Sequence, residues 1–238
     1  MLGVEDSFSR VRLLLGEDAV EAFAKMRVAV FGLGGVGGWC AEALVRSGVG
    51  HLLIVDDDKV ASSNINRQLP ATTRTIGQYK VDVLAERFKA INPAVDIEIR
   101  SERYTPESTD AFDLVSFDFV VDAIDSVACK AHLLRAATAC EKVEVFSSMG
   151  AAARTDLSRI RTSRFSKVEG DGLARALRQR FKRDGWPSRD FMCVWSDEPP
   201  CNRGLRTEAD GGANGSLMPV TAAFGLHLAS LVLDSRTP

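Results

Sequence analysis

The sequence predicts an α/β protein with a doubly wound, mostly parallel sheet, and three observations lead to that expectation. Short apolar runs alternate with stretches of helical periodicity through the first 150 residues. A glycine-rich turn, GLGGVGG, follows the first apolar run. The chain has 238 residues, enough for one large α/β domain. Strands that alternate with helices pair in parallel through crossovers, so the expected fold is Rossmann-like.

Five strands are expected in this part of the chain. They are Arg27–Phe31, His51–Val55, Val95–Arg100, Phe117–Ile124 and Lys142–Ser147, and the third alternates as a half-buried strand does. Helices are expected at 10–25, Val36–Ser47, Lys80–Ile91 and Ala128–Cys140. The helix at 80–91 ends before Asn92-Pro93, because the residue before a proline avoids the helical region.

The composition changes after Gly150. Residues 151–216 are rich in Arg, Gly, Ser and Pro and contain one clear helix near Leu173–Arg183, so we expect late strands and a basic insertion rather than an independent domain. The run Leu217–Leu233 is uncharged and 17 residues long, just under the length of a membrane-spanning helix. We expect a buried closing helix at 217–234 and no membrane span, with Pro219 interrupting the helical region.

Bulk composition excludes several classes of protein. The net charge of −2 gives no global field for a nucleic-acid partner. The five cysteines contain no C-x-x-C pair, which argues against a disulfide framework and against a zinc ribbon and favours a reducing cytoplasm. The N-terminus, MLGVEDSFSR, lacks the cations and apolar run of a signal peptide.

The glycine turn predicts a phosphate-binding site. Gly32, Gly34 and Gly37 fit G-x-G-x-x-G between a strand and a helix. In that motif the first glycine permits the tight turn, the second lets phosphate approach the backbone, and the third allows close packing of helix on strand. Asp56 ends the next strand, 24 residues after Gly32, where a carboxylate can bind ribose hydroxyls. The motif alone does not select the nucleotide.

Polar residues after Asp56 favour a triphosphate. Arg67 and Lys80 follow at 11 and 24 residues, and Asn64 and Asn66 are short neutral side chains that can bind a metal-bound phosphate. An arginine fork and a mobile lysine charge can together offset the charge of departing pyrophosphate. The sequence therefore favours nucleotidyl transfer from ATP.

Two carboxylates, Asp122 and Asp125 in VVDAIDS, close a later strand at the same edge of the sheet. Oxygen ligands suit magnesium, and Asp125 is the residue that we expect to hold it.

The motifs VFGLGGVGG, VDDDKVASSNINRQ, GQYK and VVDAIDS resemble the adenylation core of the ubiquitin-activating superfamily, which includes activators of sulfur-carrier proteins. The resemblance covers about residues 9–150. It implies an ATP site with magnesium on Asp125 and catalytic roles for Arg67, Lys80 and Asp125. It also implies a homodimer in which Arg10 reaches the partner's ATP. The implied ATP-binding residues are Gly32, Gly34, Gly35, Gly37, Asp56, Asp58, Asn64, Arg67, Gln68, Lys80, Asp125 and Ser126.

Later segments narrow the resemblance. ALRQRFKRDG (176–185), CVWSDEP (193–199) and GANGSLMPVTAAFG (212–225) resemble the tRNA threonylcarbamoyladenosine dehydratases, and the paired zinc cysteines of sulfur-carrier activators are missing. This implies one adenylation domain spanning 1–238. It also implies that ATP activates the carboxylate of the threonylcarbamoyl group on adenosine 37 of tRNA. Intramolecular attack then closes a ring and releases AMP, with net loss of water. A cysteine desulfurase or sulfur-acceptor system is a further partner that the resemblance allows.

The charge distribution also favours tRNA. Between Arg154 and Arg183 there are ten basic residues and three acidic ones. Arg175, Arg178 and Lys182 follow i, i+3, i+7 spacing, so we expect one cationic helix face that binds RNA phosphates.

Three other functions compete with an ATP-dependent tRNA dehydratase. An activator of a small ubiquitin-like or sulfur-carrier protein would share the ATP site. An NAD-dependent oxidoreductase is supported only by the glycine turn and Asp56, and a catalytically silent nucleotide-binding or scaffold protein is disfavoured by the set Arg67, Lys80 and Asp125. Cys193 is expected to be a packed thiol rather than a nucleophile, and Cys201 is given no role.

Overall fold

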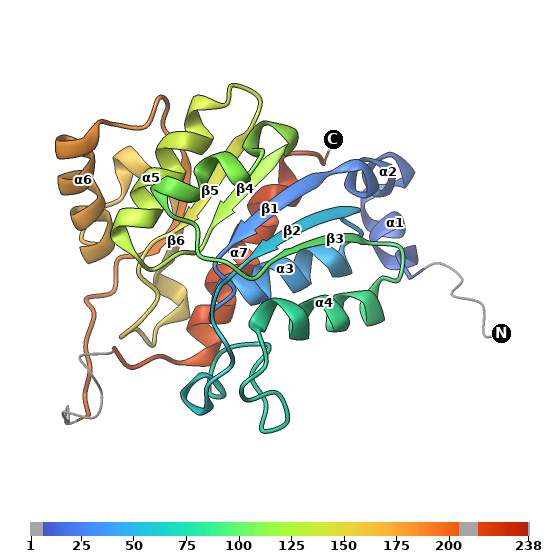
Figure 1. The fold of residues 1–238 in the computed structure, drawn as a ribbon, viewed down its shortest axis with the longest axis horizontal. Coiled ribbons are helices and arrows are strands. Elements are labelled where there is room, and N and C mark those ends of the chain that lie inside the picture. Colours follow the sequence, from blue (N-terminus) through green and yellow to red (C-terminus); the bar gives the residue numbers. More distant parts are fainter. Residues whose placement is uncertain (1–6, 205–213, 238) are drawn as a thin grey trace.

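A computed structural model describes residues 7–204 and 214–237 of the chain (Figure 1). Over this part of the chain the strands form a seven-stranded sheet in the order β3-β2-β1-β4-β5-β7-β6. Neighbouring strands are parallel except β6 and β7, which pair antiparallel. The predicted fold class is therefore confirmed. The strands are β1 Arg27–Phe31, β2 His51–Val55, β3 Asp96–Arg100, β4 Phe119–Asp122, β5 Glu144–Ser148, β6 Ile160–Arg164 and β7 Met192–Ser196.

Helices cover both faces of the sheet (Figure 1). The α-helices of the described residues are α1 Ser9–Leu15, α2 Glu17–Lys25, α3 Gly37–Arg46, α4 Lys80–Ile91, α5 Val127–Ala139, α6 Gly172–Asp184 and α7 Met218–Asp234. Short 3-10 turns lie at η1 Ser62–Asn64, η2 Pro106–Ala111, η3 Leu114–Ser116, η4 Leu157–Arg159 and η5 Phe165–Lys167. Of the segment 151–216, residues 205–213 lie outside the described part, as do the first two residues of the motif at 212–225.

Two sequence expectations about helices are wrong. The helix expected at 10–25 is two helices, because Gly16 adopts φ 87, a conformation that glycine reaches without strain. Pro219 does not interrupt the last helix but lies in its first turn, where a missing N–H costs nothing. Among the described helices none has the length and apolar content needed to span a bilayer.

Each face of the sheet has its own apolar core. On the face covered by α2, α3, α4 and α7, Phe23, Leu44, Phe88 and Phe224 are fully buried. On the face covered by α5 and α6 the core contains aromatic as well as aliphatic side chains, and Phe31 packs edge-on against Tyr104 at 5.3 Å between ring centroids. Both layers are needed because parallel strands are apolar on both sides.

The closing helix α7 packs tightly against α3. A Cβ at Gly225 would lie 2.4 Å from the Val36 carbonyl oxygen, so only glycine permits this approach. The contact brings the start of α7 to the glycine turn, where a Cβ at Gly35 would lie 3.2 Å from Thr221. The last helix of the chain thus helps to form the site that begins at residue 32.

The order of the strands fixes where a ligand can bind. β1 lies between β2 and β4, and the chain runs from β1 outward to β3 on one side and to β4 and β5 on the other. At such a switch point the loops after neighbouring strands diverge and leave a crevice at the carboxyl edge of the sheet.

Candidate active site

A pocket of about 510 Å³ lies at this carboxyl edge. Its volume suits a nucleotide-sized ligand. The structure brings together ten of the twelve predicted ATP-binding residues in its lining: Gly32, Gly34, Gly35, Asp56, Asp58, Arg67, Gln68, Lys80, Asp125 and Ser126. Gly37 and Asn64 are not among the lining residues.

The three motif glycines have different geometries. Gly32 has φ 86, and a Cβ there would lie 2.7 Å from the Ala123 carbonyl oxygen. A Cβ at Gly37 would lie only 1.8 Å from the Gly32 carbonyl oxygen, which explains why Gly37 packs inside the turn and does not line the pocket. Gly34 has no atom closer than 3.8 Å to that position, so its backbone is open to a ligand. These environments match the roles expected from the motif.

Asp56 supports the glycine turn as well as lining the pocket. Its Oδ2 accepts a hydrogen bond from the Leu33 N–H at 2.6 Å, and its Oδ1 accepts one from the Asp58 N–H at 2.9 Å. Burial raises the pKa of Asp56, and the nearby Lys80 charge partly opposes that rise. The end of β2 is therefore tied directly to the loop that follows β1.

Lys80 is a buried cation at the floor of the pocket, with 3% of its surface exposed. Its Nζ lies 2.7 Å from Asp58 Oδ2 and 3.5 Å from Asp56 Oδ1. Its backbone N–H donates to the Asp58 carbonyl, which fixes the start of α4 beside the end of β2. A buried charge needs such partners, since an unpaired one would be costly.

Arg67 enters the pocket from the segment between β2 and α4. Its Nη1 donates to the Ser63 carbonyl and to Asn66 Oδ1, each at 2.9 Å, and its carbonyl accepts from Trp39 Nε1. The guanidinium is thus held by neutral acceptors and no carboxylate within the described residues pairs with it. Its full charge is available to an anionic ligand.

The two predicted asparagines and Gln68 have separate roles. Asn64 Oδ1 accepts from the Ala61 N–H and so holds the local backbone. Asn66 Nδ2 donates to the Ser216 carbonyl and so ties this segment to the residues just before α7. Gln68 is buried and lines the pocket, and its Oε1 accepts no hydrogen bond from the described residues. An unpaired buried amide oxygen beside a pocket is a ready acceptor for a ligand donor.

The two carboxylates at and just after the end of β4, Asp122 and Asp125, have different surroundings. Asp122 is fully buried, and its Oδ2 lies 2.7 Å from Lys130 Nζ and accepts from Ser147 Oγ at 2.7 Å. Burial raises the pKa of Asp122, which the Lys130 charge opposes. Lys130 also donates to the Ile124 carbonyl, so it fixes the turn that carries Asp125 into the pocket. Asp122 therefore supports the turn, and of the two carboxylates only Asp125 lines the pocket.

Sequence reasoning missed much of the pocket wall. Arg103 and Tyr104 follow β3, Met149–Ala152 follow β5, and Ser216 and Thr221 lie around the start of α7. The first two groups share one signal, because each comes directly after a strand that ends at the carboxyl edge. The Tyr104 hydroxyl contacts His132 Nδ1 at 3.1 Å, and burial raises the pKa of Tyr104 to about 12.

Arg10 lies away from this pocket. It is exposed on α1, and Phe8, just before that helix, packs against Gly48 in the loop that leads into β2. This is the amino edge of the sheet, opposite the pocket. Leu13 and Leu14 on the same helix are 79% and 80% exposed, so α1 presents apolar surface beside Arg10.

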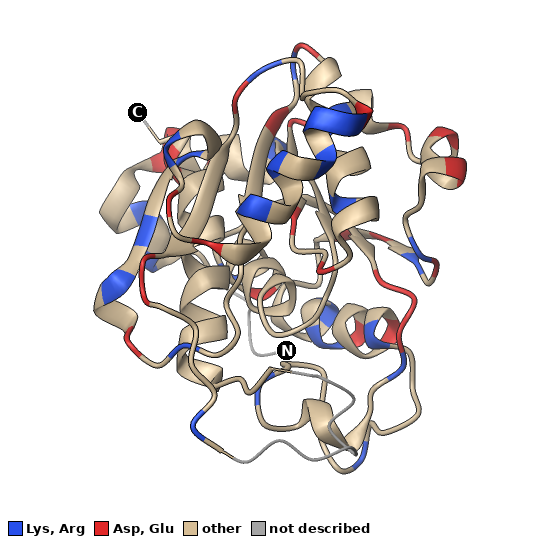
Figure 2. Cartoon of the chain, turned by 90° about the vertical axis from the view of Figure 1, so that its left-hand side faces the viewer, with Lys and Arg blue, Asp and Glu red and all other residues tan. Residues whose placement is uncertain are grey.

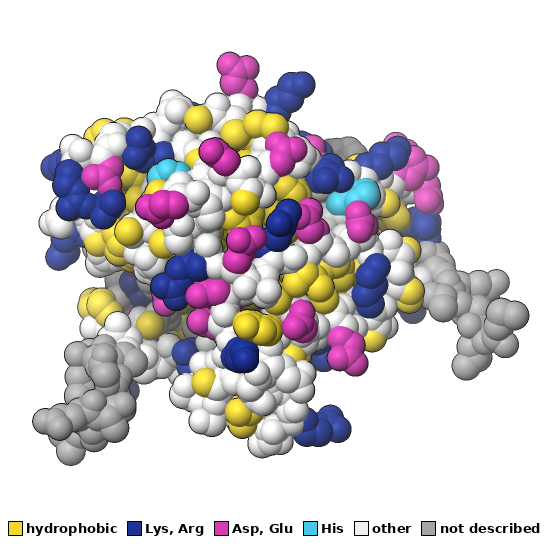
Figure 3. Space-filling model, in the orientation of Figure 1, with side chains coloured by type: hydrophobic (Ala, Val, Ile, Leu, Met, Phe, Trp, Pro, Cys, Tyr) yellow, Lys and Arg dark blue, Asp and Glu magenta, His cyan; other side chains and the backbone are white. Residues whose placement is uncertain are grey.

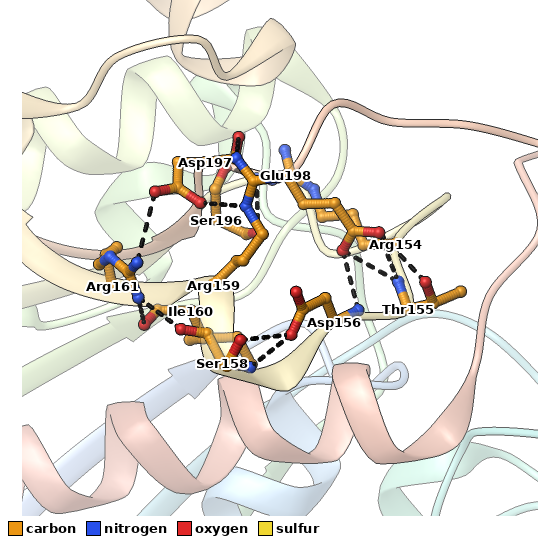
Figure 4. Close-up of polar contacts among 10 residues, drawn as sticks. All are labelled: Arg154, Thr155, Asp156, Ser158, Arg159, Ile160, Arg161, Ser196, Asp197 and Glu198. Atoms are coloured by element: carbon orange, nitrogen blue, oxygen red, sulfur yellow. Dashed lines mark hydrogen bonds and ion pairs between the residues drawn. The ribbon is translucent and has the colours of Figure 1, made fainter.

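The basic segment, residues 151–204, is less cationic than its sequence window indicates, because acidic partners follow that window. On this side of the molecule, Asp and Glu residues lie among the Lys and Arg residues (Figure 2). Arg154 is buried in an ion pair with Asp171 at 2.6 Å, and Arg159 lies 2.7 Å from Asp197. Asp197 also pairs with Arg161, and Glu198 accepts from the backbone N–H groups of residues 155 and 156 (Figure 4). Several acidic partners lie beyond residue 183, outside the window in which the charges were counted.

The three residues of the predicted cationic face of α6 differ in their contacts and exposure. Arg178 Nη2 donates to the carbonyls of Phe165 and Val168, at 3.0 and 2.6 Å, and its guanidinium lies 4.9 Å from the Phe165 ring centroid. Arg175 and Lys182, by contrast, are exposed. The expectation of one RNA-binding face through all three residues stays a prediction, with Arg178 held inward.

Cys193 is fully buried on β7, and burial raises the pKa of its thiol well above the ordinary value. It is a packed thiol, as expected. Cys201 is exposed, and all five cysteines are free.

Comparison with known proteins gives concordant matches. The ThiF family model matches residues 8–235. The tRNA threonylcarbamoyladenosine dehydratase of Bacillus subtilis is 40% identical over 195 residues, covering 81% of this chain and 75% of that relative. A crystal structure of Escherichia coli tRNA N6-threonylcarbamoyladenosine dehydratase with ATP gives a TM-score of 0.87 at 33% identity, covering 97% of this chain and 93% of that one. A structure of the same enzyme with AMP gives 0.89 at 33% identity, with 97% and 94% covered.

Proposed function

We propose a function for this chain from the premise that it belongs to the ThiF family, whose model matches residues 8–235. The chain is an ATP-dependent tRNA threonylcarbamoyladenosine dehydratase that works by adenylating a carboxylate. The observation that carries the proposal is the meeting of Arg67, Lys80 and Asp125 in one glycine-turn pocket. Similarity to the dehydratases supports the substrate, since it extends over nearly the whole chain.

The reaction needs activation because a carboxylate resists attack until one of its oxygens becomes part of a good leaving group. In our proposal the carboxylate attacks the α-phosphorus of ATP, the bond between the α- and β-phosphates breaks, and pyrophosphate leaves. An internal nitrogen or oxygen nucleophile then attacks the acyl carbon, a ring closes and AMP leaves. The carboxylate oxygen departs on AMP, so the product has lost the elements of water.

The residues of the pocket have different roles in this reaction. Backbone N–H groups at Gly34 and the start of α3 hold phosphate, and Asp56 orients the ribose. Arg67 and Lys80 offset negative charge on the departing pyrophosphate. Lys80 is already desolvated beside Asp58, so its charge acts in a medium of low dielectric.

Magnesium fits the donor set of the pocket. It binds proteins through one or two carboxylates together with substrate phosphates and water, and Asp125 supplies such a carboxylate next to the glycine turn. When bound there, the ion neutralises phosphate charge. Lys130 holds the turn that carries Asp125, because its Nζ donates to the Ile124 carbonyl.

We propose that the enzyme is a homodimer and acts in the cytoplasm. Arg10 lies at the edge of the sheet opposite its own pocket, so it can act on ATP only in another subunit. The exposed Leu13 and Leu14 beside it suit burial against a second copy. A sulfur-transfer partner remains part of the family-based proposal.

Complementation tests the role of Arg10 in trans. Arg10→Ala and Asp125→Ala chains should each lack turnover as pure dimers, because each removes one part of every site. Mixed dimers contain one site with both Arg10 and Asp125, so mixing should restore part of the activity. If Arg10→Ala alone is fully active, the arginine does not act across an interface.

The direct test of function is to incubate the chain with ATP, magnesium and tRNA that carries threonylcarbamoyladenosine. We expect the modified nucleoside to lose the mass of one water, with AMP released in equal amount. AMP formation with a ubiquitin-like carrier protein, and none with tRNA, would instead identify the chain as a protein-activating enzyme.

A further inference from the structure

A second cavity, of about 420 Å³, lies away from the nucleotide pocket and shares no lining residue with it. It is formed between η5, the middle of α6 and the segment that leads into β7. We call it the aromatic cavity. Its lining residues are Phe165, Ser166, Arg178, Trp186, Pro187, Arg189, Asp190 and Phe191.

Stacked rings give this cavity a rigid wall. Phe165 and Phe191 are buried and stacked, with centroids 5.0 Å apart and an angle of 17° between their planes. Phe181 contacts Phe165 edge-on and also contacts Trp186, with centroids 5.7 Å apart in each case. Trp186 is nevertheless 55% exposed. A large aromatic side chain is thus held on a packed support while much of its ring stays available to a ligand.

Fixed cations lie in the same wall. Arg178 donates to two backbone carbonyls, and Arg189 donates to the carbonyls of Glu141 and Cys140 at 2.8 and 2.9 Å. Neither guanidinium is paired with a carboxylate of the described residues at ion-pair distance. Because neutral carbonyls hold both groups, their charge is positioned in advance and is not cancelled.

The surface around the cavity is cationic too. Arg175 and Lys182 are exposed about one turn before and after Arg178 on α6, and Arg164 donates to the Asp190 carbonyl at 3.3 Å. Lys and Arg side chains gather at the left edge of the molecule, where α6 lies (Figure 3). Asp190 is the carboxylate in the lining, and it accepts from Ser166 Oγ at 2.7 Å.

We propose that the aromatic cavity receives an unpaired base of the RNA substrate, stacked on Trp186, while Arg175 and Lys182 contact the neighbouring phosphates. Aromatic rings beside cations are the usual means of binding single-stranded nucleic acid. A purely apolar occupant would leave the fixed guanidiniums unused, so charge favours RNA over an apolar protein segment. The inference rests on the proposed function, since that function supplies an RNA, and it adds a site for a base other than the reacting one.

The test compares two RNA probes of equal length: a stem-loop with unpaired loop bases, and a fully paired duplex. Trp186→Ala should weaken binding of the stem-loop roughly 5- to 150-fold, because stacking on an aromatic contributes about 1–3 kcal/mol per base. It should leave duplex binding and the salt dependence of affinity unchanged. Trp186→Phe should recover most of the loss, since it keeps an aromatic face.

Matched controls separate stacking from folding. Val115→Ala removes an exposed apolar side chain on η3, far along the chain from α6, and should change neither probe. ATP affinity should be equal in the wild type and in the Trp186→Ala, Trp186→Phe and Val115→Ala variants, which would show that their fold is intact. The Lys182→Ala variant should weaken the binding of both probes. It should also lower the slope of log affinity against log salt concentration by roughly 1.

The outcomes are distinct from those of the proposed function. Equal loss for stem-loop and duplex, or no loss with either, would overturn the base-stacking site. In that case the cavity would be a contact for another partner, such as a protein. A wild-type chain that dehydrates modified tRNA while Trp186→Ala binds the stem-loop normally would leave the function standing and refute only this inference.

Discussion

The nucleotide pocket and the basic segment 151–204 differ in how their charged side chains find partners. In the pocket, Asp56 follows β2, Lys80 begins α4 after the loop from β2, and Asp125 follows β4. They meet because parallel strands end at one edge of the sheet. In the basic segment, Arg159 and Arg161 pair with Asp197, which follows β7. Spacing along the chain therefore predicts the first region, whereas the second depends on an antiparallel pairing that its charge pattern does not reveal.

The two regions also contain two kinds of cation, which differ in the groups that hold them. Arg67 and Arg178 are both held by backbone carbonyls, so their charges stay available at a cavity. Arg154 is buried against Asp171 and serves the fold. A count of basic residues treats all three alike, but only their surroundings decide which can bind phosphate.

The largest expected effect comes from the glycine turn. Gly37→Ala would place a methyl 1.8 Å from the Gly32 carbonyl oxygen, so the turn must open, and we expect a loss of about 4 kcal/mol or more of unfolding free energy. Gly34→Ala meets no atom within 3.8 Å and should fold normally, yet bind ATP weakly. Urea denaturation and ATP titration measure the two effects. Equal stability of the two variants would break the distinction between packing and ligand-facing glycines.

A buried pair in the basic segment should matter almost as much. Arg154→Ala leaves Asp171 buried without its cation, which typically costs about 3–5 kcal/mol. Arg159→Ala removes an exposed ion pair and should leave the urea midpoint unchanged. If both variants unfold at the same urea concentration, the division of this segment into structural and surface cations fails.

The next largest effect is expected on the rate of catalytic turnover, when Asp125 is replaced. Asp125→Ala should lower AMP formation roughly 100- to 1,000-fold, the usual range when one electrostatic contact to a transition state is lost. The fold should survive because Asp122 and Lys130 still hold the turn. Asp57→Ala is the matched control, since Asp57 lines the same pocket but pairs with Arg103. Ordinary activity of Asp125→Ala at ordinary magnesium would remove Asp125 from the proposed metal site.

Sequence patterns predicted the frame of the pocket well, for physical reasons. The runs RVAVF and HLLIV became β1 and β2 with the expected bounds, because continuous apolar runs suit strands covered on both faces. The helix expected at 10–25 failed because Gly16 leaves the helical region. Lys130 was not identified, since a fully buried lysine is recognisable only when its partner Asp122 is seen beside it.

The aromatic cavity could not be predicted from the sequence. Phe165, Phe181 and Phe191 are far enough apart in the chain that no periodic pattern joins them, and their stacking depends on the packing of α6 against the end of β6 and the start of β7. The basic residues around them suggested RNA, but not that an exposed tryptophan lies among them.

Isotope transfer tests the central claim, carboxylate adenylation in the nucleotide pocket, most directly. The substrate is tRNA in which both oxygens of the threonylcarbamoyl carboxylate are heavy oxygen. The measurement is the mass of the AMP and pyrophosphate released by the chain with ATP and magnesium. We predict one heavy oxygen in the phosphate of each AMP and none in pyrophosphate. Unlabelled AMP formed together with dehydrated nucleoside would contradict the account, because the carboxylate oxygen would then have left without ever joining the nucleotide.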